Sequence, residues 1–548
     1  MGGRHSVSFE SKNVVTFVTT QPINIDLKRY NRTMSKRPTV FVREATGLVK
    51  NVSLLDAISM NAAWMGLGAT IALLPLYTVF FPTMSGVNLV YGSVIGFLFV
   101  LPQMFIYTII QRRTPRTGGD YVWMSRQLGG LFGSAMGLTG ACLNFIAFVA
   151  ILILSAVFSI GSVGVALGNQ NFLGLALPGN IPGAAPTSQF ILGSIIFTIL
   201  VLVNIVSPKT AIRTLTVLVV FGTIGIVLAL IILVGAGRSG VVSYVNSLGI
   251  NGTTYNSLAN SYTGPSFDFG NTLILIPFYF LFLFPWFNMS TIAGSELKGK
   301  TALRWSVPIS GITVFIIWTI VFAVLYGVAG QPFINSAFAN STLVFDYGFN
   351  FWTLAMGVAN NLAVSVTLGL AWIIWNIIFL MVTIMAVARY ILALSFDRFL
   401  PAKFAYVSPR FNSPAVAHIF DLVLAILLVG ATAFYYGELS ALSATAIGPM
   451  LFFMFVAVAS ILYGVRRKSE SNAVRAGLVI AGVLSTAVFA FVSYEFVIFP
   501  SIYGGNTLSY AFLLCSFIGG LILYLAHKQY LKKQGIDLSL AFKEIPPE

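Results

Sequence analysis

Apolar residues fill long stretches of this chain, and short polar loops separate them. The stretches recur from Leu54 almost to the end of the chain, and many run to about 20 residues, enough for a helix that crosses a lipid core of about 30 Å and too long for barrel strands of about 10 residues. The pattern predicts an all-helical integral membrane protein. Twelve spans are predicted, near residues 54–81, 87–111, 130–166, 189–206, 212–236, 271–294, 304–329, 361–396, 415–436, 440–465, 473–499 and 505–527.

The first and the sixth of these spans are interrupted near their middle. They read Asn61-Ala62-Ala63-Trp64-Met65-Gly66-Leu67-Gly68-Ala69-Thr70 and Phe284-Pro285-Trp286-Phe287-Asn288-Met289-Ser290. Gly and Pro weaken a helix, and an unbonded backbone group inside a bilayer costs several kcal/mol unless protein, water or a ligand satisfies it. Interruptions at corresponding places indicate a transport site, although glycine in a membrane helix also serves close packing.

The amino-acid composition agrees with an integral membrane protein, and the distribution of charged residues predicts its orientation in the membrane. The chain is 57% hydrophobic and 9% charged, with a mean hydropathy of +0.89 and a net charge of +15. The basic residues gather before the first span, in every second loop and after the last span, and only Arg238 falls in an opposite-side loop. By the positive-inside rule, the chain crosses the plasma membrane with both termini in the cytoplasm. The positive charge therefore reflects topology and does not predict a nucleic acid partner.

The same topology predicts two inverted halves. The first span begins on the cytoplasmic side and the sixth begins outside, so each half opens with its broken helix. Residues 53–236 form the first five-helix repeat, 237–270 an extracellular loop and 271–465 the second repeat. Residues 466–527 add two helices, 528–548 form a cytoplasmic tail, and 1–52 form a basic cytoplasmic arm.

Catalytic chemistry is not predicted. Cys142 and Cys515 both lie within spans, where thiols mostly pack as small apolar groups, so neither a disulfide nor a metal site is expected. The three histidines, His5, His418 and His527, lie in the N-terminal arm or near cytoplasmic helix ends. The sequence has no Ser/His/Asp arrangement and no metal-ligand spacing. We therefore expect no enzyme activity and no cofactor.

Several loop motifs resemble those of the amino acid-polyamine-organocation superfamily of secondary transporters. Pro115-Arg116-Thr117-Gly118-Gly119-Asp120-Tyr121 is similar to the Pro-x-Ser/Thr-Gly-Gly-x-Tyr signature of that family. Met65-Gly66-Leu67-Gly68 resembles its Gly-x-Gly break, and Ser295-Glu296-Leu297-Lys298 its Glu-Val-Lys segment. Arg389-Tyr390, Asp397-Arg398-Phe399-Leu400-Pro401 and Ser413-Pro414 follow in the family's order. The resemblance spans roughly residues 53–415.

This resemblance implies the five-plus-five inverted-repeat fold of the bacterial leucine transporter, with a substrate held between helices 1, 3, 6, 8 and 10. The residue chemistry agrees with this site. Amides beyond the first break form a free helix N-terminus that favours a carboxylate, and glycine lets the ligand approach closely. Carbonyls near Ala62 to Trp64, with those around Pro285 and Trp286, accept hydrogen bonds from an ammonium group. The predicted contacts at the first break are Ala63, Met65, Gly66, Leu67, Gly68 and Ala69.

The sixth helix departs from the family pattern. Relatives often read Phe-x-Gly-x-Glu there, whereas this chain has Phe284, Trp286 and Asn288. Some proton-coupled relatives carry a fifth-helix lysine, and Gly222 takes that place here. The coupling ion, H⁺ or Na⁺, is therefore left open. Asn376 and Thr383 of the eighth helix are candidate cation ligands, with a helix-helix hydrogen bond as the alternative.

Acids within the spans limit the substrate class. Asp56 lies at the cytoplasmic end of the first helix, and Asp421 and Glu495 belong to spans outside the proposed core, so a cationic side chain finds no counter-charge. We therefore expect neutral, apolar amino acids. Pocket candidates are Asn144, Phe284, Trp286, Asn288 and Trp372. For Asn144, Trp286, Asn288 and Trp372, a packing role is the alternative.

The leading hypothesis is a secondary amino acid transporter that works by alternating access. The alternative is an amino-acid-binding membrane sensor that keeps the fold without transport. The expected partners are the amino acid and the lipid bilayer. The sequence does not fix the oligomeric state.

Overall fold

A computed structural model of the chain describes residues 48, 50–177, 181–250, 252–436 and 443–543. Two units divide the chain, Met1–Val40 and Phe41–Glu548, and all described residues belong to the second. The predicted arm at 1–52 therefore lies almost wholly outside the described residues. So do parts of the loop before the tenth span and the end of the C-terminal tail.

Helices make up nearly all of the described chain, and twelve of its helical segments are long and apolar enough to cross a membrane. The fold class expected from the sequence is thus confirmed. The twelve segments are Leu54–Thr78, Leu89–Arg113, Gly130–Ala166, Pro186–Val206, Pro208–Ser247, Phe269–Trp286, Gly299–Ala329, Leu362–Phe396, Ala415–Phe434, Ile447–Arg466, Asn472–Ile498 and Thr507–Lys533. The division into two inverted repeats stays a prediction.

The first, third and sixth of these segments are each built from several helical pieces. The first contains α2 (Leu54–Trp64) and α3 (Leu67–Thr78). The third contains α6 (Gly130–Met136) and α7 (Asn144–Ala166), joined by a π-helical turn, η1 (Gly137–Leu143). The sixth contains α12 (Phe269–Leu273), α13 (Leu275–Phe282) and the 3₁₀ turn η3 (Phe284–Trp286), followed by α14 (Met289–Ile292) and η4 (Gly294–Glu296).

The other spans are mostly single helices. They are α4 (Leu89–Arg113), α9 (Pro186–Val206), α10 (Pro208–Ser247), α15 (Gly299–Ala329), α18 (Leu362–Phe396), α19 (Ala415–Ala431) with η7 (Thr432–Tyr436), α20 (Ile447–Arg466), α21 (Asn472–Ile498) and α23 (Thr507–Lys533). Shorter elements connect them: α5 (Gly119–Leu128), η2 (Gln170–Phe172), α8 (Leu173–Ala176), α11 (Tyr255–Ser261), α16 (Gln331–Ala339), η5 (Thr342–Asp346), α17 (Phe351–Val358), η6 (Ala402–Ala405), η8 (Ser443–Ala446), α22 (Pro500–Tyr503) and η9 (Leu538–Phe542).

Local sequence explains where several of these helices begin. Ser53 caps α2 in a capping box: its hydroxyl accepts from the Asp56 amide at 3.2 Å, while the Asp56 carboxylate accepts from the Ser53 amide at 3.1 Å. Pro208 opens α10 at the first helical turn, where a missing N–H costs nothing. The fifth span is longer than predicted, because two helical pieces meet at Gly237, whose φ of +59° suits glycine.

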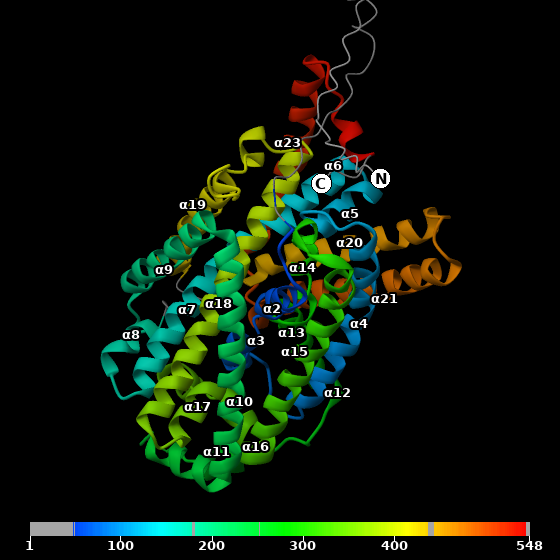
Figure 1. The fold of residues 1–548 in the computed structure, drawn as a ribbon. Coiled ribbons are helices and arrows are strands. Elements are labelled where there is room, and N and C mark those ends of the chain that lie inside the picture. The colour runs from blue at the N-terminus through cyan, green and yellow to red at the C-terminus, as the bar shows by residue number, and fades with distance from the viewer. Residues whose placement is uncertain (1–47, 49, 178–180, 251, 437–442, 544–548) are drawn as a thin grey trace, which may run out of the picture. The chain divides into compact units, whose positions relative to one another are not determined.

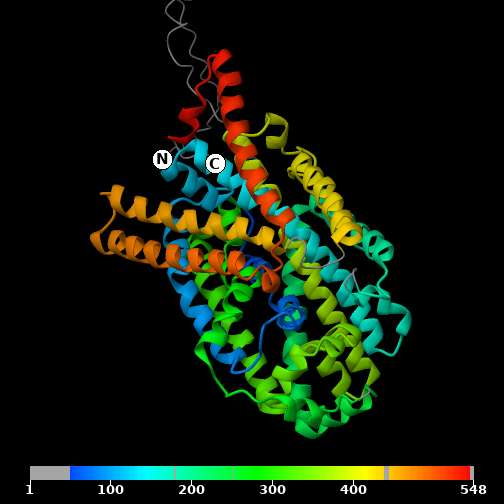
Figure 2. The same cartoon turned by 180° about the vertical axis from the view of Figure 1, so that it is seen from behind.

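The broken first span lies among the long helices. α2 contacts α10, α15 and α18, and α3 also packs against α18 (Figure 1). α18 and the third span are the most enclosed of the long segments, and every side chain of α18 from Ile378 to Ser395 is buried. α20 and α21 form a hairpin that crosses over α4 (Figure 2).

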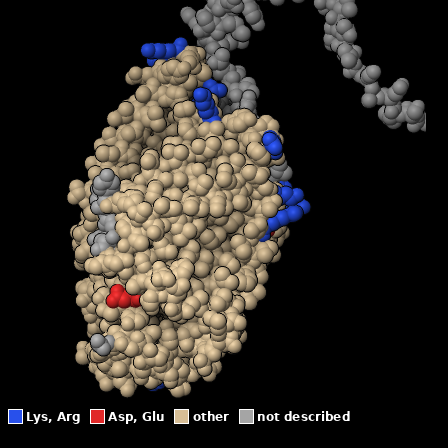
Figure 3. All heavy atoms as spheres, turned by 90° about the vertical axis from the view of Figure 1, so that its left-hand side faces the viewer, with Lys and Arg blue, Asp and Glu red and all other residues tan. Residues whose placement is uncertain are grey.

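Outward-facing helices carry apolar side chains on their exposed faces. On α10, Val217, Ile224 and Ile231 follow one another at seven-residue spacing, and each is more than 60% exposed. Much of the face drawn in Figure 3 likewise carries no charged side chains. Such apolar faces suit contact with lipid chains, because water would not favour them.

Candidate functional site

The first broken helix turns at a glycine. α2 ends at Trp64, α3 begins at Leu67, and Gly66 between them has a φ of +57°. This left-handed backbone is accessible to glycine and strained for a residue that carries a Cβ. The glycine at this position is therefore required by the turn itself, and the predicted break is confirmed.

The turn leaves hydrogen-bonding groups unused on both of its sides. Among the described residues, the amides of Leu67, Gly68 and Ala69 have no acceptor, and the first bonded amide of α3 is that of Thr70, which donates to the Gly66 carbonyl at 2.8 Å. The carbonyls of Ala62, Trp64 and Met65 likewise have no donor in the described part of the chain. All of these residues except the half-buried Ala62 are buried. The break thus presents donors and acceptors within one short segment.

Aromatic side chains of α18 pack onto the two glycines of this break. A Cβ at Gly66 would lie 2.5 Å from the Phe379 ring, and a Cβ at Gly68 would collide with the Trp375 indole. Trp352 of α17 donates its indole N–H to the Gly68 carbonyl at 2.8 Å. Sequence reasoning missed these three aromatic residues, because the glycine spacing alone does not reveal which side chains face it.

The second break differs from the first, because the chain satisfies its own carbonyls there. The helix stops after Phe282, and the Trp286 indole N–H turns back to the carbonyls of Phe280 at 3.0 Å and Leu281 at 2.9 Å. The Phe282 carbonyl accepts from Thr70 of α3 at 3.3 Å, which ties the two broken helices together. Trp286 therefore acts as a side-chain cap for α13.

Four aromatic rings gather between the two breaks, and we call them the aromatic cluster: Trp64, Phe145, Trp286 and Phe453. The Trp64 ring centroid lies 4.8 Å from that of Phe145 and 5.5 Å from that of Trp286. Trp286 in turn lies 5.3 Å from Phe453. The cluster joins the first, third, sixth and tenth spans through apolar contacts.

A buried acid lies next to this cluster. Asn288 accepts from the Trp64 indole at 2.8 Å and donates to an Asp120 oxygen at 2.7 Å. Asp120 also accepts from the hydroxyls of Tyr107 and Tyr390, at 2.9 Å each, and from the Tyr121 amide at 2.9 Å. The side chain is fully buried. Each of its oxygens thus receives two hydrogen bonds.

The environment of Asp120 shifts its protonation toward neutral pH. Burial raises its pKa to about 6 from the ordinary 3.8, while its hydrogen bonds act in the opposite direction. Sequence reasoning quoted Asp120 only as a member of the loop motif. The signal that was present is an acid in a loop otherwise rich in glycine and basic residues.

Three other predicted residues bond away from the breaks. Asn144 donates to the Thr139 carbonyl at 3.0 Å and to the Ser516 hydroxyl of α23 at 2.8 Å, so it links the third and twelfth spans. Asn376 and Thr383 donate to carbonyls of their own helix, at 3.2 and 2.7 Å. Trp372 is buried on α18 with its ring centroid 6.1 Å from that of Phe158.

Gly222, at the predicted lysine position, faces the same α18 indole as Gly68. A Cβ there would lie 2.7 Å from Trp375 Nε1. This indole nitrogen is buried and has no hydrogen-bond partner among the described residues. A bulky tryptophan on α18 thus fills the space that glycine leaves open on α10.

The loop motifs meet at one end of the membrane-spanning helices. The signature loop, Pro115–Val122, reaches the end of the sixth span, where the Gly118 amide donates to the Ile292 carbonyl at 2.8 Å. The hydroxyls of Thr117 and Ser295 bond to each other at 2.5 Å. Two motifs that are far apart in sequence are therefore in direct contact.

An ion pair connects a third motif to the same place. Arg389 of α18 donates to both oxygens of Glu296, at 2.6 and 2.7 Å, and both side chains are less than a tenth exposed. The Glu296 carbonyl accepts from the amides of Asn51 at 3.1 Å and Val52 at 3.0 Å. The segment before α2, the end of the sixth span and α18 are thus joined.

A second ion pair links the signature helix α5 to the end of α18. Arg126 pairs with the buried Asp397, which also accepts from the Tyr121 hydroxyl at 2.8 Å. Burial raises the pKa of Tyr121, and the nearby Asp397 carboxylate raises it further, so the hydroxyl stays protonated and donates.

Comparison with known proteins identifies the family to which the chain belongs. An uncharacterised protein of Sulfolobus islandicus rod-shaped virus 1 is 30% identical over 98 residues, which are 18% of this chain and 24% of the viral protein. The chain therefore matches about a quarter of the length of that relative. The sequence pattern of the amino acid permease family matches residues 54–523, which include all the motifs above and both broken helices. The chain belongs to the amino acid permease family.

Proposed function

We propose that the protein is a secondary transporter that moves neutral amino acids across the plasma membrane by alternating access. The observation that carries this proposal is the break at Gly66. Its unbonded amides at Leu67, Gly68 and Ala69 suit a carboxylate, because a helix N-terminus attracts negative charge. The unbonded carbonyls of the same break suit an ammonium group. A free amino acid carries both groups on adjacent atoms.

The surroundings favour an apolar substrate side chain. The aromatic cluster supplies the nearest ring surfaces between the two breaks. Asp120 lies close by, but its two oxygens already accept four hydrogen bonds and offer little to a cationic side chain. A substrate cation would therefore lose its hydration without gaining a counter-charge.

Orientation follows from the basic loops. Arg113, Arg126, Lys298 and Lys403 all lie in the segments that the positive-inside rule places in the cytoplasm. The signature loop and the Arg389–Glu296 pair then belong to the cytoplasmic side. We propose that these contacts hold that side closed in one state of the transport cycle.

The test is exchange of labelled leucine in proteoliposomes, with a matched series of competitors. Leucine, leucinamide and 3-methylbutylamine share the side chain and differ at the carboxylate. We expect leucine to compete and the other two to lose most of their effect, since neither brings a negative charge to α3. Equal competition by leucinamide would contradict the amide site, and binding without exchange would indicate a sensor.

The ligand series is preferable to substitution at the glycine. Gly66→Val should abolish binding, but its Cβ would also collide with Phe379, as the 2.5 Å approach shows. A matched substitution on an open helix face, Gly235→Val, should leave exchange intact because no atom lies within 4 Å of that position.

A further inference from the structure

One acid of this protein has no role in the site described above. Asp421 lies on α19 and is fully buried, and neither of its carboxylate oxygens has a hydrogen-bond partner among the described residues. An ionised carboxylate without donors is very costly in an apolar interior, far more so than a neutral carboxyl group. This conformation therefore holds Asp421 in its protonated form.

A path for the proton begins one helical turn away. His418 lies three residues before Asp421 on the same face of α19, so the two side chains are neighbours about 4.5 Å apart along the helix axis. His418 is 3% exposed, and its Nδ1 also has no partner among the described residues. Two unpartnered polar groups therefore lie next to each other in the interior.

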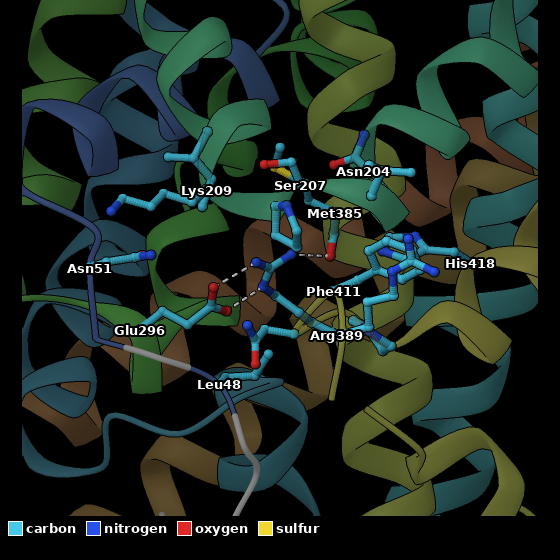
Figure 4. Close-up of a pocket in the computed structure, with 16 residues that line it drawn as sticks. Leu48, Asn51, Asn204, Ser207, Lys209, Glu296, Met385, Arg389, Phe411 and His418 are labelled. Carbon is cyan, nitrogen blue, oxygen red and sulfur yellow. Dashed lines mark hydrogen bonds and ion pairs between the residues drawn. The ribbon is translucent and has the colours of Figure 1, made fainter. Parts of the chain in front are cut away.

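His418 also lines a cavity at the cytoplasmic end of the fold. The cavity has a volume of about 360 Å³, enough for several waters, and Lys209 and Arg410 lie exposed at its wall. Figure 4 shows Arg389 within this cavity, with dashed lines to Glu296 and to the Met385 carbonyl. Water in the cavity would thus reach His418, and through it Asp421.

We propose that Asp421 is the proton-binding carboxyl group that couples transport to a proton gradient, and that His418 passes the proton between Asp421 and the cytoplasmic cavity. This inference rests on the proposed transport function. It names a coupling ion and a site on the ninth span, outside the two broken helices.

Few other titratable groups surround this site. Described residues of α7 and α9, which pack against α19, carry no charged or titratable side chain. Cys142 of η1 lies within electrostatic reach of Asp421, and Arg389 within reach of His418. Tyr390 on α18 and Lys403 on η6 are further titratable residues on the packed elements, and the sequence of η7 adds Tyr435 and Tyr436. None of the described side chains among them forms an ion pair with Asp421.

The transfer is balanced. The O–H bond of the Asp421 carboxyl breaks and an N–H bond forms at His418, which gives a carboxylate and an imidazolium. The imidazolium then gives its proton to water in the cavity and returns to neutral. Arg389 lies within electrostatic reach of His418, and its positive charge disfavours the imidazolium, so His418 holds the proton only in passing.

The experiment compares Asp421→Asn with wild type in proteoliposomes that contain a trapped pH-sensitive dye. Two quantities are measured: exchange of labelled leucine at equal pH, and its accumulation when the vesicle interior is more alkaline. Wild type should accumulate leucine above equilibrium and acidify the interior. Asp421→Asn should exchange but neither accumulate nor acidify. The matched control is Glu495→Gln, because Glu495 is the other acid in a span outside the proposed core. This variant should behave as wild type.

The outcomes separate the two proposals. If wild type exchanges leucine but ignores the pH gradient, or if Asp421→Asn accumulates like wild type, the proton site is wrong and the transporter remains. If wild type does not exchange any amino acid, the transport function itself fails. If Asp421→Asn does not elute as a single species in detergent, the same measurements on Asp421→Glu and His418→Gln test the proposal. The Glu variant should keep acidification, the Gln variant should slow it several-fold, and the absence of both effects would overturn the proposal.

Discussion

Replacing Glu296 by Gln should loosen the side of the fold that we propose to be cytoplasmic. The substitution keeps the shape of the side chain but leaves the buried Arg389 guanidinium without its carboxylate, with a neutral Gln amide oxygen and the Met385 carbonyl, now at 2.8 Å, as its acceptors. Breaking a buried ion pair by removing one partner costs about 3–5 kcal/mol. The lower figure corresponds to roughly a hundredfold change in an equilibrium constant.

The cost should fall mainly on the closed state of the cytoplasmic side. Glu296 also anchors the segment before α2 through its backbone, so the pair lies where three segments meet. A state that opens the cavity to water lets Arg389 regain hydration and avoids the penalty. We therefore expect Glu296→Gln to shift the protein toward an open cytoplasmic side.

The assay is labelling of a single cysteine. Ser207, which lines the cavity, is changed to Cys in a background where Cys142 and Cys515 are Ser. A membrane-impermeant thiol reagent should then react many times faster in the Glu296→Gln protein than in the parent. Melting temperature in detergent, measured on the same samples, should fall by several degrees.

A matched control uses the exposed ion pair between Arg113 and Glu470, which has a similar distance of 2.7 Å but a 48% exposed arginine. Exposed pairs contribute about 1 kcal/mol or less, so Glu470→Gln should change neither readout appreciably. Combining Glu296→Leu with Arg389→Met should recover much of the stability, because no charge is left unpaired. Equal labelling in Glu296→Gln and the parent would refute the reasoning.

Two further predictions concern Asp120 and Gly222. Because burial raises the pKa of Asp120 to about 6 from 3.8, its contribution to stability is complete below the ordinary value and is lost as pH rises through about 6. The melting temperature of Asp120→Asn should therefore lack that part of the wild-type decline across this pH window, and an identical pH profile would contradict the shift. Gly222→Ala places a Cβ 2.7 Å from Trp375 Nε1 and should lower stability by about 1–3 kcal/mol, whereas Gly235→Ala, with no neighbour within 4 Å, should not. Thermal denaturation of both alanine variants in one detergent decides this, and equal melting temperatures would show that Trp375 moves aside without cost.

The sequence was sufficient for features that depend on local chemistry. Hydropathy revealed the spans because lipid requires about 20 apolar residues wherever a helix crosses it. Gly66 marked the first break because its φ of +57° is accessible to glycine, and Gly118 in the signature loop has a similar φ of +69°. At both positions the backbone conformation favours glycine, and the identity of that single residue is enough to indicate it.

Features that depend on distant partners were beyond the sequence. Asn144 seemed equally suited to a pocket or to a helix contact, and its partner Ser516 is 372 residues away. Asp421 looked like an acid outside the core, and only the absence of donors for it among the described residues pointed to the role that we propose. Helix ends were also approximate: the fifth span runs to Ser247, because Gly237 joins a second helical piece where a loop from residue 237 was expected.

If the protein binds an amino acid as we propose, the two breaks divide its recognition unequally. At the first break, donors on α3 and acceptors at Ala62, Trp64 and Met65 are both without partners in the described chain. At the second break, the Trp286 indole already donates to the carbonyls that would otherwise receive a substrate ammonium. A substrate ammonium at the sixth helix would therefore have to displace the Trp286 indole to reach those carbonyls. Otherwise the carbonyls stay bonded to the indole. In the site that we propose, the backbone of the first broken helix is thus the better partner for both charged groups of the amino acid, and the Trp286 ring would contact its side chain.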